Sequence, residues 1–344
     1  MDSLTLLSKY GQPVPRYTSY PTAPHFSADV AAPDYARWLA ELPADVPVSI
    51  YLHVPFCASL CLFCACHTTV VTRPEPLAAY AEALLAEIDL VSRTIGRPLR
   101  VAHLHWGGGT PTSLPGSAIR SVMRRLQERF LFDRAAEIAV EVDPRTQSQS
   151  VVDTLAAIGV NRVSLGVQDF EPRVQTAIRR HQSAELTAGC IAQLRDAGIR
   201  SINLDLLYGL PHQTVASVQR TITQALSPRP DRVAVFGYAH VPWMKKHQAL
   251  IPEAVLPDAA DRFRQCEAAG EAILEAGYCP AGHDHFALPQ DALAMAAASG
   301  RLRRNFQGYT TDDAPVLIGF GASSIGCMPN EYVCSAHQLS AEVA

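Results

Sequence analysis

Residues 51–66 read YLHVPFCASLCLFCAC and contain four of the nine cysteines in the chain. Cys57, Cys61 and Cys64 have the spacing CxxxCxxC directly after an apolar segment typical of a β-strand, and Cys66 follows two residues later. Three thiolates on one short loop suit an iron–sulfur cube, although such a cluster ordinarily has four cysteine ligands. One iron would then take Cys66 or a bound molecule as its ligand. An open coordination position is typical of catalytic metal sites, so the loop indicates chemistry.

Two simpler interpretations of the loop remain open at this point. A zinc site usually combines a CxxC pair with a second pair of ligands, and His67 is the only nearby candidate. Disulfides are the other alternative. An odd number of cysteines crowded at one end fits a reducing compartment better than a disulfide framework.

The composition of the chain predicts a globular enzyme-sized protein. Its 344 residues are 48% apolar, enough for a sizeable core in one large domain or two smaller ones. Charged residues make up only 18%, and the net charge of −4 gives no reason to expect nucleic acid or an anionic membrane as a partner. The N-terminal residues do not resemble a signal peptide, and no apolar run is long enough to span a bilayer. We therefore expect a cytoplasmic protein.

From residue 48 onward, short β-branched runs alternate with amphipathic helical patterns. The predicted strands are VSIYLHV from residue 48, VAHLHW from 101, EIAVEV from 137, RVSLGV from 162, SINLDLL from 201 and RVAVFGY from 232. The predicted helices between them cover residues 76–94, 117–130, 150–158, 184–197 and 214–226. This order predicts parallel strands with right-handed crossovers, and a sheet with neither face in water. Because no GxGxxG motif opens the first helix, we predict an α/β fold of the partial TIM-type (β/α)6 barrel class, open on one side.

The barrel is predicted to cover residues 48–279, between an extended N-terminal arm at 1–47 and a short C-terminal extension at 280–344. The arm is rich in proline, has a helix near residues 34–41, and carries Arg16 within PRYTSYP, where it either meets a carboxylate or is solvated. Further helices are predicted at 257–276 and 291–298. In the extension, His283 and His285 are interpreted as hydrogen-bonded residues, and the basic cluster Arg301–Arg304 as a solvated face or a contact for an acidic substrate.

Each predicted strand ends in a polar or glycine-rich feature. The six features are the cysteine loop, WGGGTP at 106–111, Glu141 with Asp143, Gln168 with Asp169, Asp205, and Tyr238 with His240. In a βα barrel the carboxyl ends of the strands meet at one rim, where the active site forms. The glycines at 107–109 lack side chains, so their backbone can approach a ligand closely or make a tight turn.

These motifs together resemble those of the radical S-adenosylmethionine superfamily and, within it, the oxygen-independent coproporphyrinogen III oxidases (coproporphyrinogen III dehydrogenases) of haem biosynthesis. The motifs are PRYTSYPTA, YLHVPFCASLCLFCAC, LHWGGGTPT, EVDP, RVSLGVQDF, NLDLLYGLP, GYAH and NFQGYTT, and they span residues 15 to about 326. CxxxCxxC is typical of the superfamily, while Cys66 and RYTSYP indicate this branch.

The resemblance implies that Cys57, Cys61 and Cys64 hold a 4Fe-4S cluster whose open iron binds S-adenosylmethionine (SAM). Reductive cleavage would release a deoxyadenosyl radical that takes a hydrogen atom from a propionate of coproporphyrinogen III, and loss of carbon dioxide and an electron leaves a vinyl group. Two propionates react, giving protoporphyrinogen IX. The family also binds a second SAM molecule beside the first.

The resemblance also implies roles for individual residues. The residues that match the first SAM site are Tyr51, Gly108, Glu141 and Ile325. Those that match the second are Phe63, Gly109, Thr110, Gln168, Arg180, Asp205 and Ala239. Cys66 matches a cysteine needed for activity without ligating the cluster, and the functional positions near the cofactors are matched by His53, Phe306 and Gln307.

The expected partners are the porphyrinogen substrate, an electron donor and an electron acceptor of unknown identity, and the protein is expected to be a monomer. Two differences from the family pattern bear on the expected oxidase activity. Ala65 stands where the family loop usually has glycine, and the family's helical C-terminal domain has no counterpart before Ala344. The alternative hypothesis is therefore a haem-binding, haem-chaperone-like homologue without oxidase activity.

Overall fold

The computed structural model describes residues 5, 9–10, 26, 30–329 and 332–335. The RYTSYP motif with Arg16 lies outside these residues. Within the arm, α2 (Ala32–Ala40) confirms the helix predicted near 34–41. It packs against α3 (Pro74–Ile95), the first helix after the cysteine loop.

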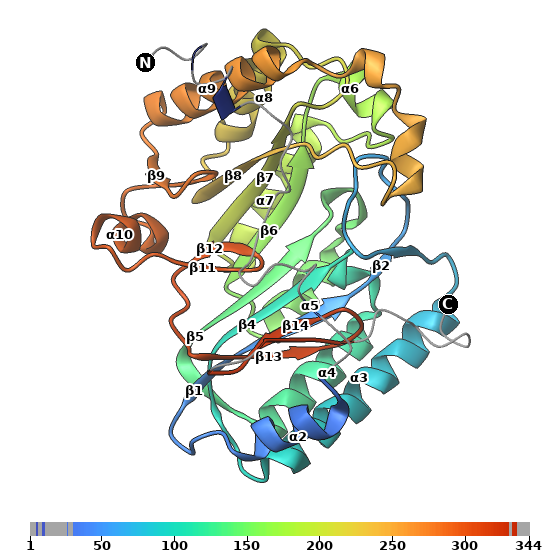
Figure 1. The fold of residues 1–344 in the computed structure, drawn as a ribbon, viewed down its shortest axis with the longest axis vertical. Helices are drawn as coiled ribbons and strands as arrows, with labels where there is room; N and C mark the ends of the chain where they lie inside the picture. Colours follow the sequence, from blue (N-terminus) through green and yellow to red (C-terminus); the bar gives the residue numbers. More distant parts are fainter. Residues whose placement is uncertain (1–4, 6–8, 11–25, 27–29, 330–331, 336–344) are drawn as a thin grey trace.

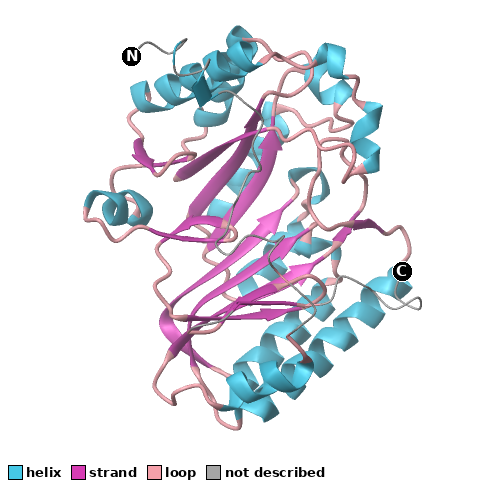
Figure 2. Cartoon of the chain, viewed as in Figure 1, coloured by secondary structure: helices cyan, strands magenta, loops and turns pink. Residues whose placement is uncertain are grey.

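Six parallel strands form the centre of the fold, as predicted. They are β1 (Pro47–Val54), β4 (Arg100–Gly108), β5 (Leu131–Val142), β6 (Arg162–Gln168), β7 (Ser201–Tyr208) and β8 (Arg232–Gly237), hydrogen-bonded in that order. The helices that connect them are α3, α4 (Gly116–Arg129), α5 (Gln149–Ala157), α7 (Ala184–Asp196) and α8 (Val215–Leu226). The helices lie outside the curved sheet, which gives the half-barrel seen in Figures 1 and 2.

Side-chain caps explain where several of the helices begin. The side chains of Ser148, Ser183 and Thr214 accept a backbone N–H from the first turn of α5, α7 and α8. Such a cap satisfies one of the unpaired donors at a helix N-terminus. At the other end of α3, Gly96 adopts φ 74°, a left-handed conformation that terminates helices and favours glycine.

The sheet extends beyond the six predicted strands on both sides, to a total of eleven among the described residues. On one side, β13 (Val316–Phe320) pairs in parallel with β1, and β14 (Ile325–Cys327) and β15 (Tyr332–Cys334) continue it. On the other side, β10 (His285–Ala287) pairs antiparallel to β8, and β9 (Cys279–Ala281) pairs antiparallel to β10. The segment predicted as a C-terminal extension therefore contributes strands to both edges of the barrel sheet.

The remaining elements lie around the mouth and the open side. They are β2 (Phe56–Cys57), β3 (Thr69–Val70), α6 (Pro172–Ala177), α9 (Ala259–Glu275), α10 (Ala292–Ala298), the hairpin β11 (Arg303–Asn305) and β12 (Gly308–Thr310), and the 3₁₀ turns Pro111–Ser113, Pro144–Thr146, Lys246–Leu250 and Glu253–Val255. Among the described residues, no helix combines the length and apolar character required to cross a bilayer.

The two faces of the sheet differ in character, although neither was expected to meet water. Residues on the outer face, such as Leu52, Leu165 and Leu204, are buried in the main core with the helices. The alternating inner positions are polar. Arg162 lies 3.1 Å from Glu137, and the Ser164 hydroxyl donates to Asp205. Because side chains alternate along a strand, one apolar face packs the helices while the other lines a polar barrel interior.

Candidate active site

The carboxyl ends of β1 and β4–β7 surround a cavity of about 200 Å³. Its lining contains most of the predicted site residues: Cys57, Cys61, Phe63, Cys64, Cys66, Gly108, Gly109, Thr110, Glu141, Gln168, Arg180 and Asp205. The strand-end prediction is thus correct for five of the six predicted strands, because Tyr238 and His240 at the end of β8 are not among the lining residues. Asp169 is an exception, because its carboxylate accepts hydrogen bonds from Gln213 and the Glu171 backbone instead.

Backbone hydrogen bonds hold the cysteine loop in place. Leu62 N–H donates to the carbonyl of Ile178 (3.0 Å), and Val71 N–H to that of Cys57 (3.0 Å). All four cysteines of the loop are free thiols; Cys61 is buried, Cys57 and Cys64 are half-buried and Cys66 is exposed. The disulfide alternative is therefore wrong for this loop.

The glycine turn after β4 packs directly on the cysteine loop. Gly109 N–H donates to the carbonyl of Val54 and Thr110 N–H to that of Phe56, both at 2.8 Å. A Cβ atom at Gly109 would lie 2.7 Å from the Phe56 carbonyl oxygen and 3.0 Å from Cys57 Sγ. Gly108 has φ 118°, which side chains rarely adopt. The turn therefore needs glycine for both space and conformation.

Two arginines and one carboxylate surround Cys61. Asp143 pairs with Arg145 (2.6 Å) and with Arg180 (3.2 Å), and both guanidinium groups also approach Cys61 Sγ, at 3.4 and 3.6 Å. Burial alone would raise the pKa of Asp143, but the hydrogen bonds from Arg145 and the charge of Arg180 outweigh it and lower the pKa. Asp143 thus stays ionised, and its charge is paired with the two guanidinium groups that also contact Cys61.

The other thiols of the loop have different environments. Burial raises the pKa of Cys57 to about 11, although the Thr110 hydroxyl, 3.6 Å away, opposes the shift. A hydrogen bond from the Cys66 side chain lowers the pKa of Cys64 to about 6. The Cys64 and Cys66 side chains therefore interact directly at the exposed end of the loop.

Acidic side chains form the opposite side of the cavity. Asp205 accepts hydrogen bonds from Ser164 (2.8 Å) and Asn203 (2.8 Å), and burial raises its pKa. Glu141 Oε1 lies 3.1 Å from Nε2 of His105. These carboxylates are suited to ribose hydroxyls or to a cationic amine.

Gln168 reaches the cavity through an irregularity in β6. The pairing of β6 with β7 shifts between Gly166 and Gln168, and Gln168 has φ 71°, which is uncommon for a residue with a side chain. Its Nε2 would lie 3.2 Å from a Cβ at Gly166. Backbone strain at an active-site residue is a recurring feature of functional sites.

Six predicted residues lie outside the cavity lining. Tyr51 Oη is 2.9 Å from Nδ1 of His53, and the Tyr51 and Phe306 rings meet edge to face at 4.8 Å. Gln307 lines a second, much smaller cavity inside the barrel, of about 20 Å³. Ile325 lies against Gly319, the strand partner of Tyr51. Ala239 is exposed, directly after Tyr238.

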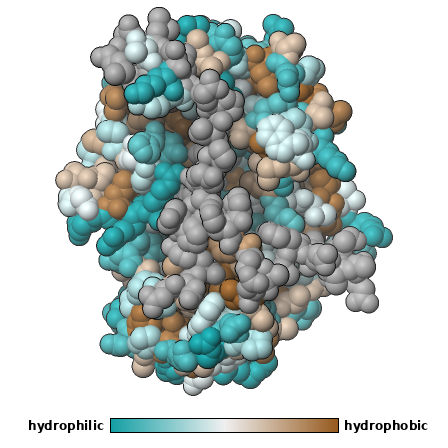
Figure 3. Space-filling view, in the orientation of Figure 1, coloured by the Kyte–Doolittle hydropathy of each residue, from teal (hydrophilic) through white to brown (hydrophobic). Residues whose placement is uncertain are grey.

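The charged groups of the C-terminal segment separate into two kinds. His285 is buried and 2.7 Å from Asp284, so its interpretation as a hydrogen-bonded residue is confirmed, whereas His283 is exposed. Arg301, Arg303 and Arg304 are exposed, and the Arg304 guanidinium lies over the Tyr309 ring at 4.6 Å. In the view of Figure 3, hydrophilic side chains gather over this β11–β12 hairpin.

The site is compatible with an iron–sulfur cluster and a polar ligand beside it. No three His, Cys, Asp or Glu side chains in the described part of the chain are grouped as ligands of a single metal ion. The thiolates of a cube bind separate irons, whereas the ligands of a mononuclear zinc converge on one point. Arg180 Nε, also in the cavity lining, is buried without a hydrogen-bond partner among the described residues, as expected beside a ligand.

Comparison with known proteins places this cavity in a family. The sequence pattern of the radical SAM superfamily matches residues 51–225. The oxygen-independent coproporphyrinogen III oxidase of Bradyrhizobium diazoefficiens is 53% identical over 98% of this chain and 75% of its own length. The chain belongs to the oxygen-independent coproporphyrinogen III oxidase family of radical SAM proteins. The same family includes the Salmonella typhimurium protein of that name, 41% identical over 98% of this chain and 73% of its own.

A solved structure of the same family supports the fold. Coproporphyrinogen III oxidase (HemN) from Escherichia coli superimposes with a TM-score of 0.91 at 39% identity, covering 97% of this chain and 75% of its own. The predicted family and the α/β partial barrel are therefore confirmed, as are a 4Fe-4S cluster and S-adenosylmethionine as the cofactors of the superfamily.

Arg145 and Ser164 are among the lining residues that the sequence did not predict. Arg145 and Ser164 both face the cavity, and Arg145 contacts Cys61. Arg145 follows directly after the strand-end motif EVDP, so its position at the rim was a usable signal. Ser164 is one position of an alternating strand, and no pattern in the sequence distinguishes it.

Proposed function

We propose that this protein catalyses the oxygen-independent oxidative decarboxylation of coproporphyrinogen III to protoporphyrinogen IX in the cytoplasm. Each of two propionate side chains would lose a hydrogen atom, carbon dioxide and one electron to leave a vinyl group. The observation that carries the proposal is the cavity that combines three loop thiols, the glycine turn and two carboxylates, in a chain closely similar to relatives named for this reaction.

Cys57, Cys61 and Cys64 would hold the cluster, with S-adenosylmethionine completing the open iron. When bound, these cofactors supply a reactive carbon radical that removes hydrogen from an unactivated position. Tyr51, Gly108, Glu141 and Ile325 are assigned to the first S-adenosylmethionine; Phe63, Gly109, Thr110, Gln168, Arg180, Asp205 and Ala239 are assigned to a second. The lining of one cavity by most of these residues supports this assignment.

The residues of the chain position and shield the reacting groups. Arg145 and Arg180, both held by Asp143, fix Cys61 and compensate negative charge beside it. Carboxylates Glu141 and Asp205 orient the nucleoside and amine groups of the ligand. Cys66 at the exposed edge, and the packed rings of Tyr51 and Phe306 with His53, would contact the substrate side of the site and exclude competing hydrogen donors.

The substrate carries four carboxylates, and the exposed arginines of the β11–β12 hairpin have the matching charge. Arg303 and Arg304 lie on the same hairpin as Phe306 and Gln307, so a carboxylate bound there stays close to the cofactor residues. Arginine pairs with carboxylates through a planar two-donor geometry. We propose that these arginines bind the substrate propionates that are not being decarboxylated, including the one that reacts second.

Product analysis tests the proposal. Reconstituted protein incubated anaerobically with dithionite, S-adenosylmethionine and coproporphyrinogen III is expected to form deoxyadenosine and protoporphyrinogen IX. Cluster-loaded protein that forms no deoxyadenosine would contradict the radical assignment. Deoxyadenosine without porphyrin product would contradict the substrate. Stoichiometric haem binding with no product would favour the haem-chaperone alternative, which the comparisons do not favour.

A further inference from the structure

A basic surface surrounds the outer side of the cysteine loop. Three chain segments form it, residues 55–73, 172–183 and 238–252, and we call them together the basic face. They contain six Lys or Arg residues and no Asp or Glu, in a chain whose net charge is −4. The positive charge is therefore concentrated beside the cysteine loop, while the rest of the protein is acidic.

Hydrogen bonds join the segments 172–183 and 238–252 to the segment 55–73, which carries the thiols. Lys245 Nζ donates to the carbonyl of Cys66 (2.9 Å), and Nε2 of His247 lies 2.8 Å from that of Cys64. On the other side, the Leu62 N–H donates to the carbonyl of Ile178, the neighbour of Arg179. A molecule bound to the basic face would therefore lie against the backbone of the cysteine loop itself.

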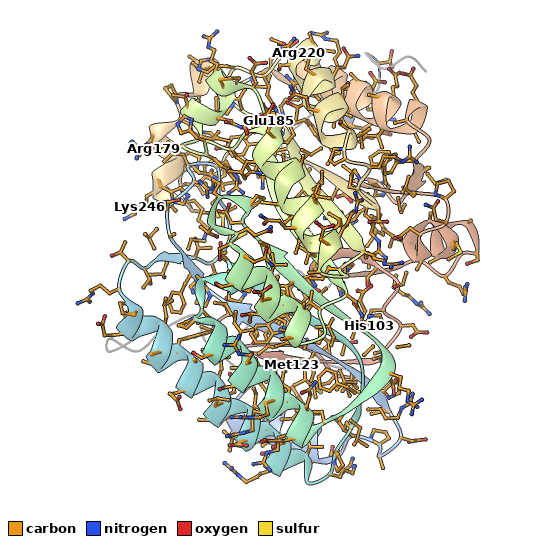
Figure 4. The ribbon with its side chains drawn as sticks, turned by 180° about the vertical axis from the view of Figure 1, so that it is seen from behind. His103, Met123, Arg179, Glu185, Arg220 and Lys246 are labelled. Carbon is orange, nitrogen blue, oxygen red and sulfur yellow. The ribbon has the colours of Figure 1, made fainter. Side chains whose placement is uncertain are left out.

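Four of the six basic side chains of the basic face are exposed, whereas Arg180 is buried in the cavity lining and Lys245 donates to the loop backbone. Lys246 and Arg179 are both exposed, and Figure 4 shows them on the same edge of the molecule. Arg173 on α6 is also exposed. Exposed charges of one sign attract an oppositely charged partner and accelerate its association, with little effect on the protein's own fold.

An exposed apolar turn adjoins these charges. Trp243 and Met244 are 76% and 70% exposed, immediately before Lys245 and Lys246. The turn is held from within, because Gln248 accepts a hydrogen bond from Val241 N–H and donates to the Phe63 carbonyl. Tryptophan, methionine and arginine are enriched at protein interfaces, and apolar side chains presented by a fixed turn are typical contact residues.

We propose that the basic face is the docking surface for a small acidic electron-carrier protein that reduces the cluster, an inference that rests on the proposed function. One electron leaves the reduced carrier, which is oxidised by one electron, and enters the cluster without any bond being made or broken. Charge complementarity selects the carrier. Because the basic face is hydrogen-bonded to the backbone of the cysteine loop, a carrier bound to this face lies beside the thiols.

Charge reversal tests the docking surface. The probe is a flavodoxin of negative net charge, and its affinity for cluster-loaded protein is measured by titration at several salt concentrations. We expect the double variant Lys246→Glu with Arg179→Glu to weaken binding on the order of tenfold. Trp243→Ala is expected to weaken it severalfold, with the salt dependence unchanged because no charge is lost. The matched control is Arg134→Glu, an exposed arginine near the start of β5, at the opposite end of the barrel.

Two reductants separate this inference from the proposed function. With dithionite, the double variant should form deoxyadenosine at the wild-type rate, whereas with reduced flavodoxin its rate should fall with its affinity. Equal affinity of wild type and double variant, or an equal loss in Arg134→Glu, would overturn the docking surface. A dimer in solution that the double variant dissociates would also overturn it by assigning the face to a second copy. Failure of dithionite-driven turnover in wild type would instead contradict the proposed function, while the binding titration still tests the docking.

Discussion

A single methyl group at Gly109 is expected to disturb the cysteine loop without disturbing the barrel. In Gly109→Ala the new Cβ would lie 2.7 Å from the Phe56 carbonyl oxygen, about 0.7 Å short of the 3.4 Å at which ordinary contact begins. The obstacle is backbone, so no side chain can rotate away. Forcing an extra carbon into a packed region costs roughly 1–3 kcal/mol. The cysteine loop should therefore shift, and both its stability and its cluster content should fall.

The assay compares apo-protein unfolding in guanidinium chloride with iron and sulfide content after anaerobic reconstitution. The matched control is Gly189→Ala, in the middle of α7, where a new Cβ meets nothing within 4 Å. There the same change should raise stability by about 0.5–1 kcal/mol, because glycine is unfavourable inside a helix, and leave iron content unchanged. Wild-type stability and iron loading in Gly109→Ala would refute the packing argument.

Three further predictions concern the loop, its ion pairs and the barrel interior. Cys57→Ala should abolish cluster assembly, whereas Cys66→Ala should keep the iron and lose turnover; equal iron loss in both would show that their roles are wrongly divided. Asp143→Ala removes the carboxylate that pairs with both the half-buried Arg145 and the buried Arg180, and should cost about 3 kcal/mol in denaturant unfolding. Asp133→Ala, in an exposed ion pair, should cost nothing measurable. Burial lowers the pKa of His103, but Glu137 and Asp312 outweigh burial and raise it overall, so its stabilising effect is present below about pH 6.5 and lost as the pH rises through the folded-state pKa. His103→Gln should therefore destabilise the protein more at pH 6 than at pH 8.5, and an equal loss at both values would contradict this sign.

The barrel strands and most cavity residues were predictable because they rest on local patterns. A strand of apolar residues followed by CxxxCxxC, GGG or an acidic residue fixes both the element and its rim position. The polar inner face was harder to recognise, since Ser49, His103 and Arg162 alternate with apolar residues that dominate the pattern. Their partners are on neighbouring strands, and the register in which two strands pair cannot be predicted from the sequence of one strand alone.

The strands at the sheet edges were missed for another physical reason. Strands β9, β10, β14 and β15 have three residues each, too short for periodicity to distinguish them from loops. Similarly, Gln168 was expected at a strand end and, by resemblance, at the second S-adenosylmethionine site, but its backbone conformation was not predicted. Its left-handed backbone is imposed by the shift in pairing with β7, a tertiary feature that no local propensity predicts.

The pairing of β13 with β1 ties the formation of the site to nearly the whole length of the chain. While a ribosome makes the protein, the strand that carries the cysteine loop has one free edge until Val316–Phe320 emerges. An unpaired strand edge invites pairing with other chains. The strand that carries the cysteine loop is therefore paired on both edges only after residues 316–320 have been made.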